Sequence, residues 1–218
     1  MKFCVIVPVY NEEKELPALI VELKKSGTLA FFVDDGSNDE SQRLIEESGF
    51  PFAKHQKNQG KGSALKTGMD WAFSQDFDAV ITLDGDGQHP INQISEFVKL
   101  AQNKDFVIGN RINRVGKMPI HRRLSNRLVS WLVSLRVGKH IPDAQCGMRL
   151  IKRKVWENIA INNNGYFSEI ELVIKVVLQK YSVGIIDIPA IYNGCNSSIR
   201  PVREIVVFLF GYLRSFAW

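Results

Sequence analysis

Acidic side chains follow two buried apolar segments of the sequence, and these residues are the best suited to chemistry. Asp34 and Asp35 end the run LAFFVDD, and Asp84 and Asp86 end the run AVITLDGD. Such carboxylates can accept hydrogen bonds from a base or ribose, and a D-x-D pair can share one divalent cation that bridges a diphosphate. The pattern predicts a site for a phosphorylated ligand and a hard metal ion. For residues 34–39, a simple turn with a helix cap is the alternative.

Two further segments carry polar groups toward the same kind of ligand. The stretch NQGKGSALKTG lacks the spacing of a phosphate-binding P-loop, but its glycines, including Gly62, open a helix whose N-terminus can face an anion beside Lys61. Glu169 and Glu171 are two residues apart on another predicted helix, so only one of them can point toward a common centre. His89 is interpreted as a loop residue rather than a metal ligand.

The positive charge of the chain is concentrated in one segment. The formal net charge is only +5, but no Asp or Glu occurs between Asp105 and Asp143. This acid-free segment predicts a local anionic partner: phosphate groups, an anionic membrane surface or nucleic acid. Nucleic acid is disfavoured because Trp131 is the only aromatic ring available for stacking within the basic helix, and it lies on the apolar stripe. The eight basic residues of the segment are Arg111, Arg114, Lys117, Arg122, Arg123, Arg127, Arg136 and Lys139.

The elements that must position these residues alternate between strands and helices. Continuous apolar runs predict strands covered on both faces, and helices with 3.6-residue periodicity lie between them. This pattern favours an α/β fold with an open, mostly parallel twisted sheet and a ligand crevice at the carboxyl ends of its strands. Strands are expected at about 3–10, 29–35, 51–56, 79–86, 106–111 and 183–192, with a short strand that leads to a helix within 143–156, and further helices at 13–26, 41–48, 60–74, 122–138, 165–181 and 205–218.

The 218 residues, 45% of them hydrophobic, are expected to form one domain. The pattern changes after Asp105, so we expect a first half, 1–105, and a specialised second half, 106–218, which ends in an apolar helix. The apolar run at the start is too short for a signal peptide, and no segment approaches the ~18 residues of a membrane span. Three scattered cysteines favour a reducing compartment. We therefore expect a cytoplasmic protein that is peripheral to a membrane.

Two amphipathic segments bear on that expectation. Segment 122–138 places Leu124, Leu128, Trp131, Leu132 and Leu135 on one helical face, which suits an anionic membrane surface or, alternatively, an ordinary core-facing stripe. The terminal helix is strongly apolar, which suggests a partner or membrane surface. Its apolar residues include Val206, Val207, Phe208, Leu209, Phe210 and Trp218.

Several motifs together resemble family-two glycosyltransferases of the GT-A fold, in particular the branch similar to dolichol-phosphate mannose synthase. The motifs follow one another in the family's order over nearly the whole chain: VIVPVYNEE, FFVDDGSND, NQGKGSALKTG, ITLDGDGQHP, IGNR, DAQCGMRL, GYFSEIEL and SSIRPVRE. The resemblance implies an inverting, metal-dependent transfer of a hexose from a GDP- or UDP-sugar to a polyprenyl phosphate. The resemblance also implies that the chain works at a membrane surface or with a membrane partner subunit, and that it does not bind nucleic acid.

The resemblance also implies that 1–105 is the nucleotide-sugar-binding half and 106–218 the acceptor-binding half, and it implies a role for individual residues. Arg111 and Arg123 match arginines that receive the acceptor phosphate, while Asp143 and Glu171 match acidic positions of the acceptor half. Asp86 has a catalytic role through the metal, which is Mg²⁺ or Mn²⁺ and is held by Asp84, Asp86 and Gln88. The residues expected to bind the nucleotide sugar are Pro8, Tyr10, Glu12, Asp34, Asp35, Lys61, Gly62, Asp84, Gly85 and Asp86.

The sequence departs from the family pattern at one motif, and two alternative functions remain open. The family's terminal G-x-S-K reads GCNSS here, so Arg200 or Arg203 would replace the missing lysine near the donor phosphates. A glycosyltransferase that acts on a hydroxyl of a lipid-linked or cell-surface glycan is the first alternative. It would need Glu171 or Asp143 as a base, whereas a lipid phosphate is already an anionic nucleophile. A non-catalytic module that binds sugar nucleotide or membrane is the second.

Overall fold

A computed structural model describes residues 1–112, 120–189, 191 and 201–218, without the side chains of 121, 122 and 201–205. Within these residues one seven-stranded sheet has the order β3-β2-β1-β4-β6-β5-β7. The neighbouring pairs are parallel except that β6 is antiparallel to both β4 and β5. The predicted α/β fold with a mostly parallel sheet is therefore confirmed. The strands are β1 (Phe3–Val9), β2 (Ala30–Asp34), β3 (Phe52–Lys54), β4 (Ala79–Thr82), β5 (Phe106–Asn110), β6 (Arg149–Lys152) and β7 (Val183–Asp187).

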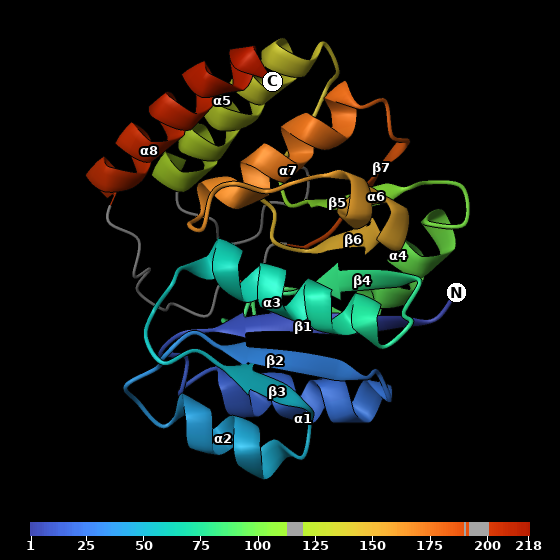
Figure 1. The fold of residues 1–218 in the computed structure, drawn as a ribbon, viewed down its shortest axis with the longest axis vertical. Helices are drawn as coiled ribbons and strands as arrows, with labels where there is room; N and C mark the ends of the chain where they lie inside the picture. The colour runs from blue at the N-terminus through green and yellow to red at the C-terminus, as the bar shows by residue number, and fades with distance from the viewer. Residues whose placement is uncertain (113–119, 190, 192–200) are drawn as a thin grey trace.

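Helices cover the sheet, and two of them form a separate layer at one end. Figure 1 shows α5 and α8 side by side at the opposite end of the molecule from α1 and α2. Helix α7 lies between this pair and the sheet, because it contacts both α5 and α8. The α-helices are α1 (Leu16–Ser26), α2 (Ser41–Ser48), α3 (Lys61–Ser74), α4 (Ile94–Leu100), α5 (Ile120–Val137), α6 (Arg153–Asn158), α7 (Phe167–Leu178) and α8 (Pro201–Arg214), with short 3₁₀ turns at Ile91–Gln93 and Ser215–Ala217.

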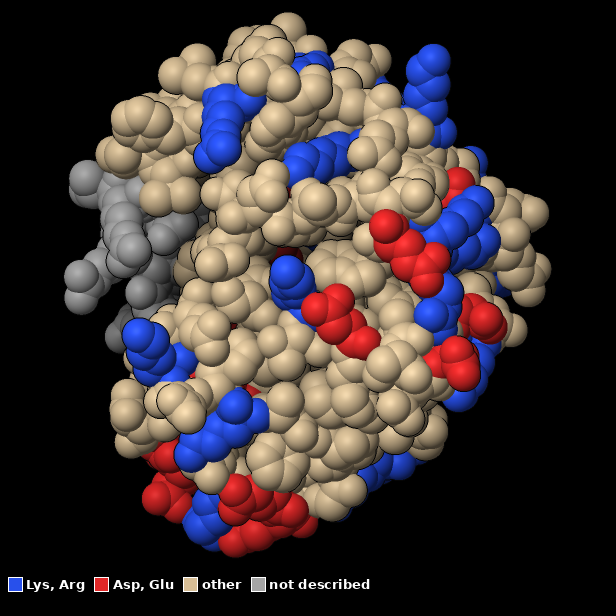
Figure 2. Space-filling view, viewed as in Figure 1, with Lys and Arg blue, Asp and Glu red and all other residues tan. Residues whose placement is uncertain are grey.

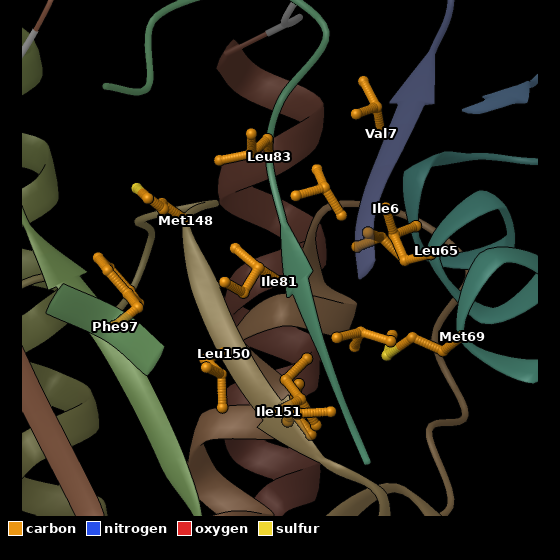
Figure 3. Packing of buried hydrophobic residues seen from close by; sticks show 14 of the residues in the cluster. Ile6, Val7, Leu65, Met69, Ile81, Leu83, Phe97, Met148, Leu150 and Ile151 are labelled. Carbon is orange, nitrogen blue, oxygen red and sulfur yellow. The ribbon is translucent and has the colours of Figure 1, made fainter. Parts of the chain in front are cut away.

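The central strands are buried on both faces, as their continuous apolar sequences predict. Every residue of β2, β4 and β5 is buried, which is typical of strands covered by helices on both sides. Close packing brings α3 onto β1, since a Cβ added to Gly68 would overlap the Ile6 side chain. Figure 3 shows the resulting core, in which side chains of β1, β4 and β6 meet Leu65 and Met69 of α3, with Phe97 of α4 also packed into the cluster.

The element boundaries differ from the predicted ones mainly where loops carry polar residues. Helix α1 begins at Leu16 rather than near residue 13, with Pro17 in its first turn, a position that suits proline because it needs no N–H donor there. Strand β4 ends at Thr82, so the acidic residues that follow lie in a turn. The helices α4 and α6 are short, and only α6 was expected. No helix in the described part of the chain is both long and apolar enough to cross a bilayer.

Candidate functional site

The predicted acidic pairs lie at one edge of the sheet, after strands that flank β1. Asp34 ends β2, and Asp84 follows β4, and both strands pair in parallel with β1. Their carboxyl ends therefore meet at the same edge, where open α/β sheets bind ligands. The N-terminus of α3, at Lys61, reaches this edge as well, since Lys61 contacts Asp84. The site is built from segments that are far apart in sequence but adjacent in the sheet.

The carboxylate of Asp35 holds the loop that precedes α3. Its Oδ1 lies 2.6 Å from His55 Nδ1 and accepts a hydrogen bond from the Gln59 N–H at 2.9 Å, while its Oδ2 accepts one from the Gly60 N–H at 2.8 Å. Asp34 differs, because its Oδ1 accepts from Ser37 but its Oδ2 is buried without a hydrogen-bond partner. A buried acceptor without a donor is costly, so Asp34 Oδ2 is the better placed of the two carboxylates to bind a ligand's hydroxyl or N–H.

Asp84 is the centre of a compact charged cluster. Lys61 Nζ lies 2.6 Å from Asp84 Oδ1 and 2.8 Å from Glu169 Oε2, and His89 Nε2 lies 3.0 Å from Asp84 Oδ2. Burial alone would raise the pKa of Asp84, but the positive charge of Lys61 and the contact with His89 hold it well below its usual range. Asp84 is therefore a carboxylate at neutral pH. Glu169, rather than Glu171, is the acidic residue of α7 that reaches this centre.

A second group of acids lies beside Asp84 with less compensation. The pKa of Asp86 is raised by its burial and by the negative charge of Asp84. Glu12 has a pKa raised to about 7, chiefly by burial and then by Asp86 and other acids including Asp84. Gly85 packs against this group, with a built Cβ position 3.0 Å from the Pro8 carbonyl oxygen and 3.5 Å from Glu12 Cγ. The excess of negative charge at this point favours binding of a cation.

These residues fit a divalent metal, although the protein offers only part of its coordination shell. Asp84, Asp86 and the Gln88 side chain would provide oxygen ligands, which Mg²⁺ and Mn²⁺ prefer. Gln88 is fixed near Asp86, since its backbone N–H donates to Asp86 Oδ1 at 3.0 Å. Among the residues that the structure describes, no group of three or more His, Cys, Asp or Glu side chains is arranged to hold a metal. The oxygen atoms of Asp84, Asp86 and Gln88 are the ligands that the described residues would offer such an ion.

Arg111 is fixed beside the acidic cluster by a buried ion pair with Asp143. Arg111 donates three hydrogen bonds to the Asp143 carboxylate, from Nε at 2.8 Å, from Nη2 at 3.1 Å and from its backbone N–H at 3.1 Å. The Asp143 side chain is fully buried. Burial lowers the pKa of Arg111 and raises that of Asp143, but mutual attraction reverses both effects, so that both groups are charged. Asp84 also acts on the pKa of Arg111, which places the guanidinium within electrostatic reach of the D-x-D pair.

The loop 143–148 connects the two charged groups. A Cβ at Gly147 would overlap the Asp84 carboxylate, and the Gly147 carbonyl accepts a 2.6 Å hydrogen bond from Thr82 Oγ1. Arg149 is fully buried and donates to the carbonyl oxygens of Cys146, Ala144 and Glu169. The loop therefore fixes Asp143 at one end and lies against Asp84 at the other, while Arg149 joins it to α7.

Glu171 lies outside the centre formed by Asp84 and Lys61. Its fully buried carboxylate accepts hydrogen bonds from the backbone N–H groups of Asn162 and Asn163 at 3.0 Å each and from Lys175 at 2.6 Å. Although burial raises the pKa of Glu171, these donors together hold it below its ordinary value. Through these hydrogen bonds Glu171 holds the loop that precedes α7.

The remaining predicted residues take separate positions. Pro8 lies near the end of β1, and Tyr10, after that strand, is 38% exposed. Gly62 is buried in α3, and a Cβ there would overlap Ser168 Oγ. Arg123 lies on the first turns of α5, and its Nε is buried without a hydrogen-bond partner. Arg200 lies outside the described residues, as does the side chain of Arg203.

Sequence reasoning did not assign His55, His89 and Glu169 to the site. A signal for His55 exists in the strand register, because Lys54 of β3 pairs with Asp34 of β2, which places the next residues of both strands side by side. His89 was interpreted as a loop residue, but its ring contacts Asp84. For Glu169 the spacing left the choice with Glu171 open, and only the packing of α7 decides it.

Comparisons with known proteins agree with this architecture. The model of the family described as Glycosyl transferase family 2 matches residues 4–160. The UDP-N-acetylglucosamine--dolichyl-phosphate N-acetylglucosaminyltransferase of Methanococcus voltae is 26% identical over 86% of this chain and 85% of that protein. The undecaprenyl-phosphate 4-deoxy-4-formamido-L-arabinose transferase of Pectobacterium atrosepticum is 34% identical, over 69% of this chain and 49% of that protein.

A solved structure of similar fold is the glucosyl-3-phosphoglycerate synthase of Mycobacterium tuberculosis in complex with Mn²⁺, UDP-glucose and phosphoglyceric acid. It has a TM-score of 0.76 and 18% identity, and the match covers 97% of this chain and 79% of that one. The same enzyme with Mg²⁺ and UDP has a TM-score of 0.77 and 17% identity, over 97% of this chain and 79% of that one. At this level of identity the likeness supports the fold.

Proposed function

Because the chain belongs to glycosyl transferase family 2, as its motifs predicted, we propose that it transfers a hexose from a GDP- or UDP-sugar to a polyprenyl phosphate. The observation that carries the proposal is the juxtaposition of two charged groups. The carboxylates of Asp84 and Asp86 suit a metal-bound diphosphate, and Arg111 is fixed beside them with its guanidinium charged. The two relatives described above are named as transferases for dolichyl phosphate and undecaprenyl phosphate, which supports a polyprenyl phosphate as the acceptor.

The donor would bind along the carboxyl ends of β1, β2 and β4. The unpartnered Oδ2 of Asp34 is suited to a hydroxyl or N–H of the nucleoside, and Asp35 positions the loop before α3. Helix α3 begins at Lys61, next to Asp84, so its N-terminus and the Lys61 charge favour a phosphate there. Binding of the diphosphate would give Lys61 a third anionic partner, in addition to Asp84 and Glu169.

The metal would be Mg²⁺ or Mn²⁺ held by Asp84, Asp86 and Gln88. When bound, it supplies charge neutralisation for the departing nucleoside diphosphate. The acidic residues at this point are the part of the site that this chain provides, and together with burial, which is the larger cause, they raise the pKa of Glu12 to about 7.

The acceptor phosphate would lie on Arg111, with Arg123 as a second candidate contact. A phosphate oxygen attacks the anomeric carbon, the bond from that carbon to the diphosphate oxygen breaks, and the configuration inverts. Because a phosphate monoester is already anionic at neutral pH, no carboxylate has to remove a proton. In this mechanism Asp143 and Glu171 are positioning residues, since one orients Arg111 and the other holds the loop before α7.

An assay of nucleoside diphosphate release tests the proposal. The full chain is incubated with a panel of UDP- and GDP-hexoses, with Mg²⁺, Mn²⁺ or EDTA, and with or without a short polyprenyl phosphate. We expect release with one donor that requires both metal and lipid phosphate. Asp86→Asn should lower the rate at least about 100-fold, whereas Asp76→Asn, whose side chain is 97% exposed, should leave it unchanged.

Other results would change the assignment. Release that does not depend on the lipid phosphate would favour a hydroxyl acceptor, and release in EDTA would refute the metal site. If a nucleotide sugar is bound but none is consumed under any condition, the chain is a binding module without catalysis. We further infer that the enzyme works at the cytoplasmic face of a membrane, where its lipid acceptor would be embedded.

A further inference from the structure

Helices α5 and α8 pack against each other and against α7, which fixes the face that each turns outward. Tyr212 of α8 donates a 3.1 Å hydrogen bond to the Leu132 carbonyl of α5, and Arg136 donates to Ser215. On the inner side, the rings of Phe208 and Phe167 are 6.2 Å apart, and Gly211 lies so close to Phe167 that a Cβ would overlap its ring. The inward faces of both helices are therefore occupied.

The outward faces of the two helices are apolar and exposed. At about 100° per residue, the exposed apolar residues of each α-helix fall within an arc of roughly 100°. Large apolar side chains that are individually exposed are common, but a contiguous group marks an interaction surface. We name this group the apolar platform, and its members, between 47% and 77% exposed, are Ile120, Leu124, Leu128, Trp131, Leu135, Val206, Leu209, Phe210, Leu213 and Phe216.

The exposure of these residues decides between the two sequence interpretations of α5 and narrows the expectation for the terminal helix. The stripe of α5 is not a core-facing stripe, since Leu124, Leu128, Trp131 and Leu135 are all more than half exposed. In α8, however, Val207 and Phe208 pack against the core, as does Trp218 beyond it, so only part of its apolar surface is available.

Basic residues surround the platform, and acids are nearly absent from its helices. Helix α5 contains no Asp or Glu, and Glu204 is the only acid in the sequence of α8. Arg127 and Arg214 on these helices and Lys139 just beyond α5 are exposed. In Figure 2, the surface at the end of the molecule formed by α5 and α8 is tan with separate blue groups, and the red side chains lie away from it. An apolar face with a cationic rim suits a surface that is apolar inside and anionic outside.

We propose that the apolar platform lies on the surface of a bilayer that contains anionic lipids. Its leucine and aromatic side chains enter the interface, and Arg127, Lys139 and Arg214 lie among the lipid phosphates. A second copy of this chain is a poorer occupant, because two such faces would bring the same positive rims together. The proposal deepens the proposed function, on which it rests for the lipid nature of the acceptor, and it places Arg123 of α5 near the phosphates.

Vesicle binding tests the platform without any substrate of the enzyme. The full chain is sedimented with vesicles of phosphatidylcholine alone or of phosphatidylcholine and phosphatidylglycerol in equal parts. We expect binding to the anionic vesicles that weakens with salt. Leu128→Glu and Phe210→Glu should each lower the partition coefficient about tenfold or more. Leu29→Glu is the matched control, because Leu29 is 42% exposed but lies outside the platform, and it should bind like the wild type.

Two measurements keep the result interpretable. Urea unfolding should show that all three variants are as stable as the wild type, since their sites are exposed. Sedimentation velocity in the absence of lipid should show no self-association. Failure to bind anionic vesicles, equal binding by Leu128→Glu and Leu29→Glu, or a dimer that Leu128→Glu dissociates would each overturn the proposal.

The platform and the proposed function can fail separately. Transfer to a short polyprenyl phosphate dispersed in water, without vesicles, depends on the catalytic site alone. If that transfer occurs but vesicle binding does not, the platform proposal is wrong and the function stands. If vesicle binding occurs without any transfer, the function is wrong and the platform stands.

Discussion

The buried pair of Arg111 and Asp143 permits a quantitative prediction. Asp143 has no exposed side-chain surface and the Arg111 side chain is only 14% exposed, so water can compensate little of either charge. Asp143→Asn removes the negative charge but keeps the shape, and leaves the guanidinium buried without its counter-ion. Breaking a buried ion pair in this way costs about 3–5 kcal/mol of unfolding free energy. For a chain of this length, that corresponds to a fall in Tm of roughly 6–20 °C.

Urea unfolding followed by circular dichroism measures this loss as a lower midpoint at an unchanged slope. Asp76→Asn is the control, with an expected effect within about 0.5 kcal/mol because Asp76 is exposed. A double-mutant cycle with Arg111→Met should show strong coupling, so that the double variant loses less stability than the sum of the single ones. Additive effects, or an Asp143→Asn protein as stable as Asp76→Asn, would refute the interpretation that the buried ion pair of Arg111 and Asp143 stabilises the fold.

Two further predictions concern the loop that packs on Asp84 and Glu171 of α7. Gly147→Ala should lower turnover at least about tenfold, because the added methyl group would displace Asp84. Gly165→Ala is the control and should leave turnover unchanged, because a Cβ at Gly165 meets open space. Equal rates for the two variants would contradict the proposed packing of Gly147 on Asp84. The pKa of Glu171 in the folded protein lies below the ordinary value of 4.5, because its hydrogen-bond donors outweigh burial. Its contribution to stability is therefore present above pH 4.5 and is lost as the pH falls toward the lower folded value. Glu171→Gln should therefore be about 1.5–3 kcal/mol less stable at pH 7, and this difference should shrink in unfolding measured below pH 4.5. A difference that stays constant with pH would show that the charge of Glu171 does not stabilise the fold.

The sequence predicted the sheet and the position of the acids because both depend on local patterns. Continuous apolar runs such as AVIT can be stable only when buried on both faces. Parallel strands bring their carboxyl ends to one edge, so Asp34 and Asp84 had to lie near each other once the strands were identified.

The contacts that complete the site depend on packing between distant segments. The close approach of Gly147 to Asp84 joins residues more than sixty positions apart in the sequence, and no periodicity of the sequence predicts it. The choice between Glu169 and Glu171 depends on the rotation of α7 about its axis, which is set by Phe167 and the other residues it buries.

The sequence also could not predict that the apolar platform is exposed, and here the cause is not packing between distant segments. An apolar stripe that faces a core and one that faces lipid have the same 3.6-residue period. The basic, acid-free composition around Leu128 was the only local indication, and the structure decides the orientation by turning Val133 of α5 inward and leaving Leu128 and Trp131 exposed.

The central claim is that the acceptor is a phosphate on a polyprenyl lipid. The most direct test compares two acceptors that differ only in that group, a short polyprenyl phosphate and the corresponding polyprenol, with the same nucleotide sugar and metal. Mass spectrometry of the lipid fraction should show a hexosyl phosphate product from the first and none from the second, with no product from Arg111→Ala. Equal glycosylation of the polyprenol, or product from neither lipid while a glycan hydroxyl is glycosylated, would contradict the account.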